Sequence, residues 1–145
     1  MIHQFSPVIY PFKLWVGIDV PAHDIIADFY GYDKSRGEVS DFTEDELNKA
    51  TLYATTYPVV HKDSGLIGCF VHFHSRRYAV PAVMAHEASH VSDFISDKFG
   101  LASDASSLFD EGEARAYIVQ WAVECMEKVR KGKTKEIKED EKRKD

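Results

Sequence analysis

The first half of the chain contains short runs of apolar, β-branched and aromatic residues separated by polar breaks, a pattern typical of strands. Such runs occupy residues 12–20, 54–61 and 66–74. Four residues that end in Gly65 join the second run to the third, which predicts a hairpin loop. Pro58 cannot donate a hydrogen bond to a ladder, so we expect the run at 54–61 to be an edge strand or to be interrupted.

The second half of the chain shows the periodicity of helices. Between Pro81 and about Phe99, apolar residues recur at helical spacing, at Val83, Met84, Val91, Phe94 and Ile95. Pro81 suits the first position of a helix, and Gly100 stands where a helix commonly ends. A second long helix is predicted from Glu111 to about Arg130.

Shorter elements are predicted between the first strand and the hairpin. Residues 21–27 favour a short helix, and residues 29–37, with their glycines and polar side chains, favour a loop. Thr43 and Glu46 form a capping-box pattern for a helix that we expect to run to about Leu52. Strands followed by helices predict an α+β fold, with a small antiparallel sheet and helices packed on one face.

The composition indicates one globular domain with an acidic surface. The 145 residues suffice for a single domain, which we assign to residues 1–130, and residues 131–145 predict a frayed or disordered tail. The formal charge is −6, and because the tail holds seven Lys or Arg and five Asp or Glu, residues 1–130 carry −8. Phosphate recognition needs clustered Lys and Arg, so we expect no nucleic-acid partner.

The sequence also bears on compartment. No apolar run approaches the length of a membrane span, and the N-terminal residues lack the pattern of a secretory signal. Cys69 and Cys125 lie far apart, each in an apolar pattern, which favours reduced structural thiols over a disulfide. We therefore expect a soluble, cytoplasmic protein with no membrane partner.

The residues that carry chemistry lie in the predicted helix at 81–99, in the His-Glu-x-x-His sequence of residues 86–90. On a helix, His86 and His90 lie one turn apart on one face, so both rings can bind one metal ion. Glu87 flanks the same face and can take a proton from a metal-bound water. This pattern predicts a zinc hydrolase with one Zn²⁺ ion bound by His86 and His90 and with Glu87 as the catalytic base.

A catalytic zinc site needs a third protein ligand. The arrangement with a third histidine on the same helix is excluded, because Asp93 and Ser96 stand where a glycine and a histidine would be required. Acidic residues near the start of the second helix remain, namely Glu113, Glu111 and, as a distant third, Asp110. Glu113 is favoured over Glu111, since Gly112 is a poor residue for a helix interior.

Two histidines followed about twenty residues later by a glutamate resemble the gluzincin branch of zinc metallopeptidases. More closely, residues 54–60, 85–90 and 113–117 resemble small metallopeptidases of bacteriophages and mobile elements, and a weaker similarity runs to the ImmA/IrrE-type peptidases. The resemblance implies a minimal zincin-like fold, Glu113 as the third zinc ligand, and hydrolysis of a peptide bond inside a bacterial host cell. The Asn-Glu-x-x-Ser-Asp pattern of the thermolysin group is not present.

The resemblance also suggests how a protein or peptide substrate is bound. In such peptidases the strand before the metal-binding helix pairs with extended substrate, which here implies residues 70–74. Tyr117, His72 and His74 are candidates for stabilising the oxyanion. Asp93, three residues after His90, either orients a ligand or is an ordinary exposed aspartate.

Two other functions are compatible with the motif. One is a non-catalytic zinc-binding interaction domain of the same fold, and the other is hydrolysis of a non-peptide amide by the same zinc-bound water. A binding module needs no base, so the presence of Glu87 favours an enzyme. A purely structural zinc site is normally closed by a fourth Cys or His ligand, and the sequence offers no evident one.

Overall fold

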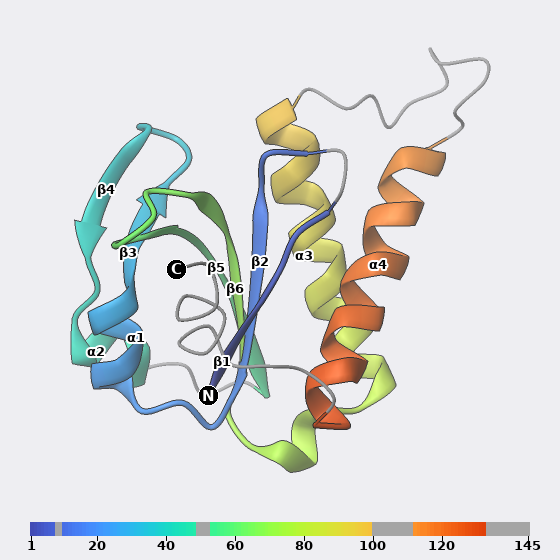
Figure 1. Ribbon diagram of the computed structural model, residues 1–145, viewed down its shortest axis with the longest axis horizontal. Coiled ribbons are helices and arrows are strands. Elements are labelled where there is room, and N and C mark those ends of the chain that lie inside the picture. The colour runs from blue at the N-terminus through green and yellow to red at the C-terminus, as the bar shows by residue number, and fades with distance from the viewer. Residues whose placement is uncertain (8–9, 49–52, 100–111, 133–145) are drawn as a thin grey trace, which may run out of the picture.

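The computed structural model describes residues 1–7, 10–48, 53–99 and 112–132. Within these ranges the chain forms a six-stranded sheet with the strand order β1-β2-β6-β5-β3-β4, together with four α-helices and a short 3-10 helix at Arg76–Tyr78 (Figure 1). The strands are β1 (Ile2–Phe5), β2 (Lys13–Ile18), β3 (Phe29–Asp33), β4 (Glu38–Asp41), β5 (Ala54–His61) and β6 (Ile67–Phe73). The helices are α1 (Ala22–Asp28), α2 (Glu44–Asn48), α3 (Pro81–Phe99) and α4 (Glu113–Arg130).

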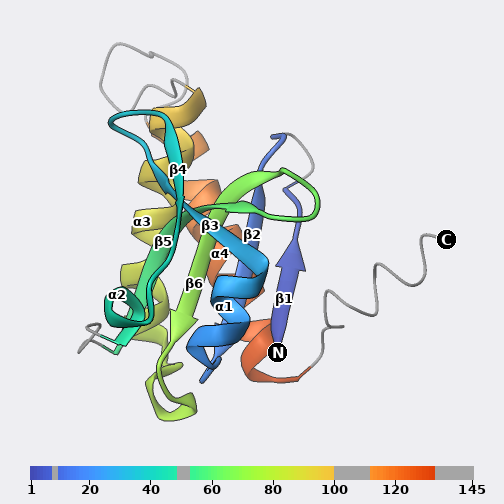
Figure 2. The ribbon, with the colours of Figure 1, turned by 90° about the vertical axis from the view of Figure 1, so that its left-hand side faces the viewer.

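The sheet lies between α3 and α4 on one side and α1 and α2 on the other (Figures 1 and 2). It separates two hydrophobic cores. Cys69 and Val71 of β6 pack with residues of α3 and α4, whereas Phe70 packs with Ile25 of α1 and Leu47 of α2. Successive side chains of one strand thus contribute to opposite cores. The α+β class is confirmed, but the prediction that the helices cover one face is wrong, because α1 and α2 cover part of the other.

The sheet is mixed, so the prediction of an antiparallel sheet is also wrong. β2 runs parallel to β6, with Leu14 opposite Cys69, while the other neighbouring strands are antiparallel. Parallel neighbours need a long connection, and residues 19–66 supply it. Gly68 allows the two strands to approach, since a Cβ atom there would lie 1.9 Å from the carbonyl oxygen of Lys13.

Most of the predicted elements are confirmed. The runs at 12–20, 54–61 and 66–74 contain β2, β5 and β6, and the short helix predicted after β2 is α1. The helix predicted over Pro81–Phe99 is α3. The capping box is present at α2, where the Thr43 N–H donates to the Glu46 carboxylate and the Glu46 N–H donates to Thr43 Oγ1.

Two predictions in the first half of the chain need correction. The loop predicted at 29–37 contains β3, which forms a hairpin with β4. Its aromatic residues supply the apolar face that a strand needs, since Phe29 is fully buried and stacks on Phe70 with ring centroids 5.1 Å apart. The strand β1 was not predicted; it pairs with β2, and its buried residues are Ile2 and His3.

Several predictions fall on residues that the structure does not describe. They are the end of the helix expected to reach Leu52, the helix stop at Gly100, the start of the second helix at Glu111, and most of the tail at 131–145. Of the helices that the structure describes, none is long and apolar enough to cross a membrane.

Two further features follow from the described residues. Cys69 and Cys125 are buried and free, as predicted, and burial raises the pKa of both thiols, that of Cys125 to about 12.

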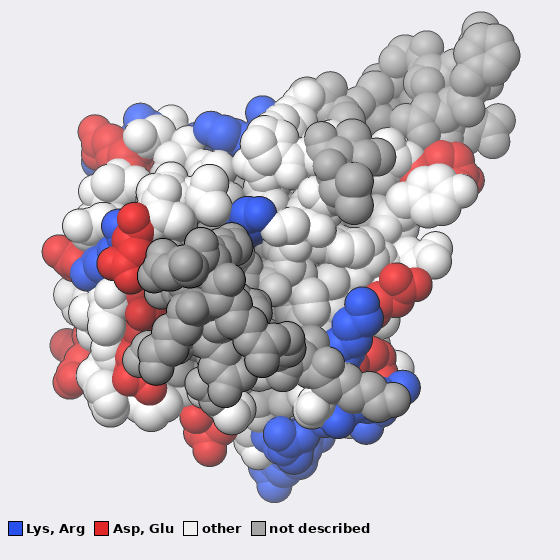
Figure 3. Space-filling model, in the orientation of Figure 1, with Lys and Arg blue, Asp and Glu red and all other residues white. Residues whose placement is uncertain are grey.

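Acidic residues occur along β4 and α2, and Figure 3 shows basic side chains gathered near the C-terminal end of α4. The charge of the molecule is therefore unevenly distributed.

Candidate metal centre

His86 and His90 lie on one face of α3 with their rings directed toward each other. Their Nε2 atoms are 3.3 Å apart, and both residues are exposed. In a tetrahedral site with Zn–N distances of about 2.0–2.1 Å, two ligand nitrogens lie roughly 3.3 Å apart. The spacing of the two nitrogens therefore fits a zinc ion held by both rings.

The orientation of α3 follows from its apolar stripe. Met84, Ala88, Val91 and Ile95 recur at intervals of four, three and four residues and are all fully buried against the sheet and α4. A helix that buries this stripe must direct the side chains of residues 86 and 90 away from the core. The packing of α3 thus accounts for the exposure of both histidines.

Glu87 lies on the flank of α3 that faces β5. The residue is only 4% exposed, and its Oε2 atom accepts a hydrogen bond of 2.5 Å from the hydroxyl of Thr56 on β5. A buried carboxylate is costly unless it is hydrogen-bonded, and the Thr56 hydroxyl supplies such a bond. The predicted base is thus held between helix and sheet, next to the histidine pair.

These residues line one cavity of about 350 Å³. His86, Glu87 and His90 form its α3 wall, and the β5 wall includes Thr56 and Pro58. The cavity therefore brings together two nitrogen ligands, a carboxylate and a strand. The two histidine nitrogens have a spacing that suits a shared metal ion, and the Glu87 carboxylate lies beside them as a candidate proton acceptor.

The third ligand is not settled by the described residues. Glu113 is the first residue of α4 and is exposed, whereas Glu111 and Asp110 lie outside the described ranges. In the part of the chain that the structure describes, no group of three His, Cys, Asp or Glu side chains is close enough to hold a metal ion. Glu113 therefore stays a prediction as the third ligand.

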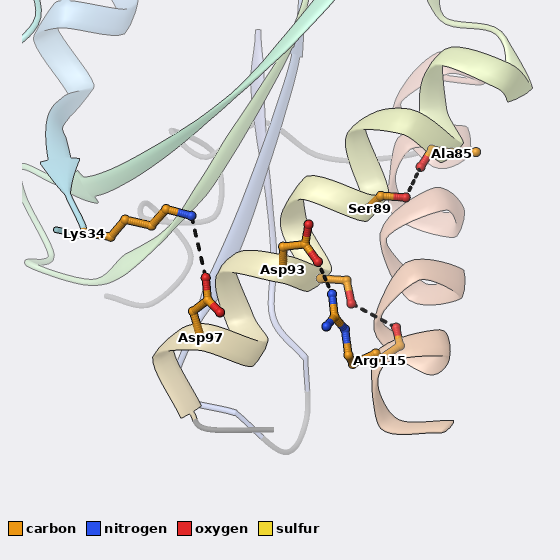
Figure 4. A network of polar contacts seen from close by, with 7 residues as sticks. Lys34, Ala85, Ser89, Asp93, Asp97 and Arg115 are labelled. Carbon is orange, nitrogen blue, oxygen red and sulfur yellow. Dashed lines mark hydrogen bonds and ion pairs between the residues drawn. The ribbon is translucent and has the colours of Figure 1, made fainter. Parts of the chain in front are cut away.

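The first turn of α4 is tied to α3 just beyond His90 (Figure 4). The Ser92 hydroxyl donates to the main-chain oxygen of Arg115 at 3.1 Å, and the Arg115 guanidinium forms an ion pair with Asp93. Asp93 also lines the cavity. It is thus more than an ordinary exposed aspartate, because it connects the face of α3 that carries His86 and His90 to the turn that carries Glu113.

The histidines suggested as oxyanion stabilisers are not in this cavity. His72 is buried on the opposite face of the sheet, where Nε2 accepts a hydrogen bond of 3.0 Å from the main-chain N–H of Val20. Burial lowers the pKa of His72 to about 4. His74 Nε2 lies 3.1 Å from Thr55 Oγ1, and both histidines line a separate hollow. The expectation that these histidines stabilise the oxyanion is wrong. Side chains along a strand point alternately to opposite faces, and the neighbours of His72, Val71 and Phe73, face α3.

The third candidate oxyanion stabiliser, Tyr117, also lies away from the cavity. Its side chain is 65% exposed on α4, and it is not among the described residues that line the cavity. The neighbouring Ile118 takes the buried position on this helix. No candidate for the oxyanion role that was named from the sequence is therefore placed beside His86 and His90 in the described structure.

Most strand residues that line the cavity belong to β5, and Cys69 is the residue of β6 that lines it. β6 pairs with β2 along one edge and with β5 along the other, so residues 70–73 cannot add a substrate strand, and the expectation is wrong. By contrast, the only residues of β5 that pair with β3 are Val59–His61. Among the described strands, none pairs with the outer edge of residues 54–58. The prediction of an edge or interrupted strand from Pro58 is wrong for the strand as a whole, because β5 runs unbroken from Ala54 to His61 between β6 and β3, and it holds only for residues 54–58.

Comparisons with models of protein families, with curated proteins and with solved structures found no match to this chain. The resemblance to zinc metallopeptidases therefore stays a prediction from the motif and its sequence context. What the site can do follows from the positions of His86, Glu87, His90 and Thr56 in this fold.

Proposed function

We propose that the protein is a zinc-dependent metallopeptidase that hydrolyses a peptide bond of an extended peptide or protein substrate. The observation that carries the proposal is the meeting of His86, His90 and Glu87 in one cavity beside a stretch of β5 whose outer edge pairs with no described strand. Each of these parts has a separate role in the reaction.

The two histidines would hold the metal through their Nε2 atoms, whose 3.3 Å separation suits a shared zinc ion. Glu113 is the proposed third ligand. When bound, zinc supplies Lewis-acid chemistry, lowering the pKa of a water molecule and polarising the substrate carbonyl.

Glu87 would move the proton. Its carboxylate accepts a proton from the attacking water and then gives that proton to the leaving amine nitrogen, so the residue ends the cycle as it began. The water oxygen ends in the new carboxyl group of the product. The burial of Glu87 and its bond to Thr56 favour this role, because a base must be held in one orientation to act on a reacting water.

The outer edge of residues 54–57, which no described strand pairs with, would bind the substrate. An extended peptide can add to residues 54–57 by main-chain hydrogen bonds, and the added strand would lie along the cavity that contains Glu87. Pro58 ends the stretch of main-chain donors, because proline has no N–H group. Recognition of this kind is tolerant of substrate sequence.

The test is cleavage of a proteome-derived peptide library, with new termini identified by mass spectrometry. We expect cleavage by the zinc-loaded wild type and by a His23→Ala control, which removes an exposed histidine of α1. Glu87→Gln should keep zinc and lose cleavage by about 10²-fold or more. Equal results for wild type and Glu87→Gln, with zinc bound to both, would contradict the proposal and favour a non-catalytic zinc-binding domain.

A further inference from the structure

Thr56 contacts the proposed base from an element that the His-Glu-x-x-His motif does not include. We propose that Thr56 is a positioning residue, whose hydroxyl holds the Glu87 carboxylate in the orientation needed for proton transfer. The inference rests on the proposed function. It assigns to β5 a second role beside the binding of substrate.

The contact is short and partly buried, with the carboxylate as its buried partner. The Thr56 Oγ1 atom lies 2.5 Å from Glu87 Oε2, and Glu87 is 4% exposed. Hydroxyl-to-carboxylate bonds of this length are charge-assisted and stronger than neutral hydrogen bonds. A glutamate side chain has three rotatable bonds, so one strong contact at its end removes much of its freedom. The bond restrains the Oε2 end of the carboxylate.

The donor itself is held rigidly. Thr56 lies opposite Val71 in the ladder between β5 and β6, and β6 is in turn paired with β2. Its β-branched side chain has few allowed χ1 rotamers. The hydroxyl is therefore presented by a paired strand of the sheet rather than by a loop, which is the kind of support that a catalytic group needs.

Thr56 also connects the base to the substrate edge. The residue lies within the stretch of β5 whose outer edge has no partner among the described strands. A peptide added to that edge would take its position from the same main chain that carries the Thr56 hydroxyl. β5 would then position both the substrate and the Glu87 carboxylate. The distance between them would therefore not depend on α3 alone.

Three variants separate positioning from mere packing. Thr56→Val removes the hydroxyl and keeps the β-branched shape, whereas Thr56→Ser keeps the hydroxyl and loses the methyl group. Thr43→Val makes the same chemical change at the hydrogen-bonded cap of α2, remote from the cavity, and controls for a general loss of stability.

The kinetic arm uses a peptide that the wild type is shown to cleave. Thr56→Val should lower kcat by about tenfold to a hundredfold with KM and zinc content unchanged, because a misplaced base slows proton transfer without weakening substrate binding. Thr56→Ser should restore most of kcat, and Thr43→Val should leave it unchanged. A wild-type kcat in Thr56→Val, an equal loss in Thr56→Ser, or loss of zinc from Thr56→Val would each overturn the positioning role.

A second arm needs no activity. The urea midpoint of the metal-free protein is measured for Thr56→Val alone and in a Glu87→Leu background, which lacks the acceptor. Thr56→Val should lower the midpoint in the first case and not in the second, whereas Thr43→Val should lower it equally in both. Equal shifts for Thr56→Val would show that the bond does not form. A shift that depends on Glu87, together with no cleavage by the wild type, would show that the hydrogen bond between Thr56 and Glu87 forms. It would overturn the proposed function and, with it, the catalytic role of Thr56.

Discussion

His72 is the residue whose chemistry the fold alters most clearly. Its ring is buried, accepts a hydrogen bond from the Val20 N–H and contacts the ring of His74, with ring centroids 4.7 Å apart. Burial first, and the positive charge of a protonated His74 second, lower its pKa from an ordinary value of 6.5 to about 4. The folded protein therefore keeps His72 neutral where an unfolded chain would bind a proton.

This difference predicts a loss of stability in acid. Between pH 6.5 and about pH 4 the unfolded state binds the extra proton, so the free energy of unfolding falls as pH falls through this window, by up to about 3 kcal/mol. His72→Gln, which retains a hydrogen-bond acceptor without a titrating ring, should flatten the dependence. Urea midpoints at pH 7.5 and pH 4.5, measured for the wild type and for His72→Gln, give the loss of stability in acid for each protein. If the stability of His72→Gln falls as much in acid as that of the wild type, groups other than His72 cause the effect.

At the scale of elements, the pairing of α3 with α4 bears on the proposed zinc site. The Asp93–Arg115 ion pair and the Ser92 hydrogen bond hold the turn that carries Glu113 beside the turn that follows His90. If Glu113 is the third ligand, these contacts position it. Partners of this kind outside the ligand set typically contribute tenfold to a hundredfold in metal affinity.

We predict that Arg115→Met lowers the affinity for zinc by about tenfold, measured by competition with a chromophoric chelator. Arg130→Met is the matched control, since Arg130 pairs with Glu127 within α4 and away from the cavity. The fold should survive both changes, which a circular dichroism spectrum would verify. Equal affinities for the two variants would mean that the ion pair does not position a ligand.

A second prediction at this scale concerns the contact between β2 and β6. Gly68→Ala would place a Cβ atom 1.9 Å from the main-chain oxygen of Lys13, and only separation of the two strands can relieve that clash. We expect a loss of about 1–3 kcal/mol in the free energy of unfolding. Gly31→Ala should be milder, because its nearest contact is the movable ring of Phe42 at 3.2 Å. Comparable thermal melting curves for the two variants would contradict this account of the strand pair.

The elements also show which features can be predicted from local sequence. The apolar stripe of α3 can be predicted from the helical spacing of its apolar residues, and the capping box of α2 from its Thr and Glu. Both features depend only on residues within one or two turns. The hairpin of β3 and β4 was missed, since Phe29 becomes strand only by packing on Phe70, which is distant in sequence. Strand direction and the face taken by His72 likewise depend on contacts between distant segments.

The candidate site divides in the same way. His86, Glu87 and His90 could be predicted, because helical geometry alone brings them to one flank. Thr56 and Arg115 could not, because nothing local indicates that β5 and α4 supply the partners of Glu87 and Asp93.

At the scale of the whole molecule, the sheet keeps two environments apart. The face covered by α3 and α4 carries the cavity with His86, Glu87 and His90, while the face covered by α1 and α2 carries His72 and His74 in a separate hollow. The half of β5 that borders the cavity is the part that β3 leaves unpaired. The His86–His90 pair and a stretch of β5 that no described strand pairs with on its outer edge thus lie at one cavity of the molecule.

The central claim is that His86 and His90 bind zinc with a carboxylate from the start of α4, and metal content by elemental analysis tests it most directly. Protein purified without added metal should contain close to one equivalent of zinc, retained in Glu111→Ala and in His23→Ala. The zinc should be lost in His86→Ala and in Glu113→Ala. Folded wild-type protein that contains no zinc, and that takes up none when zinc is offered, would contradict the claim.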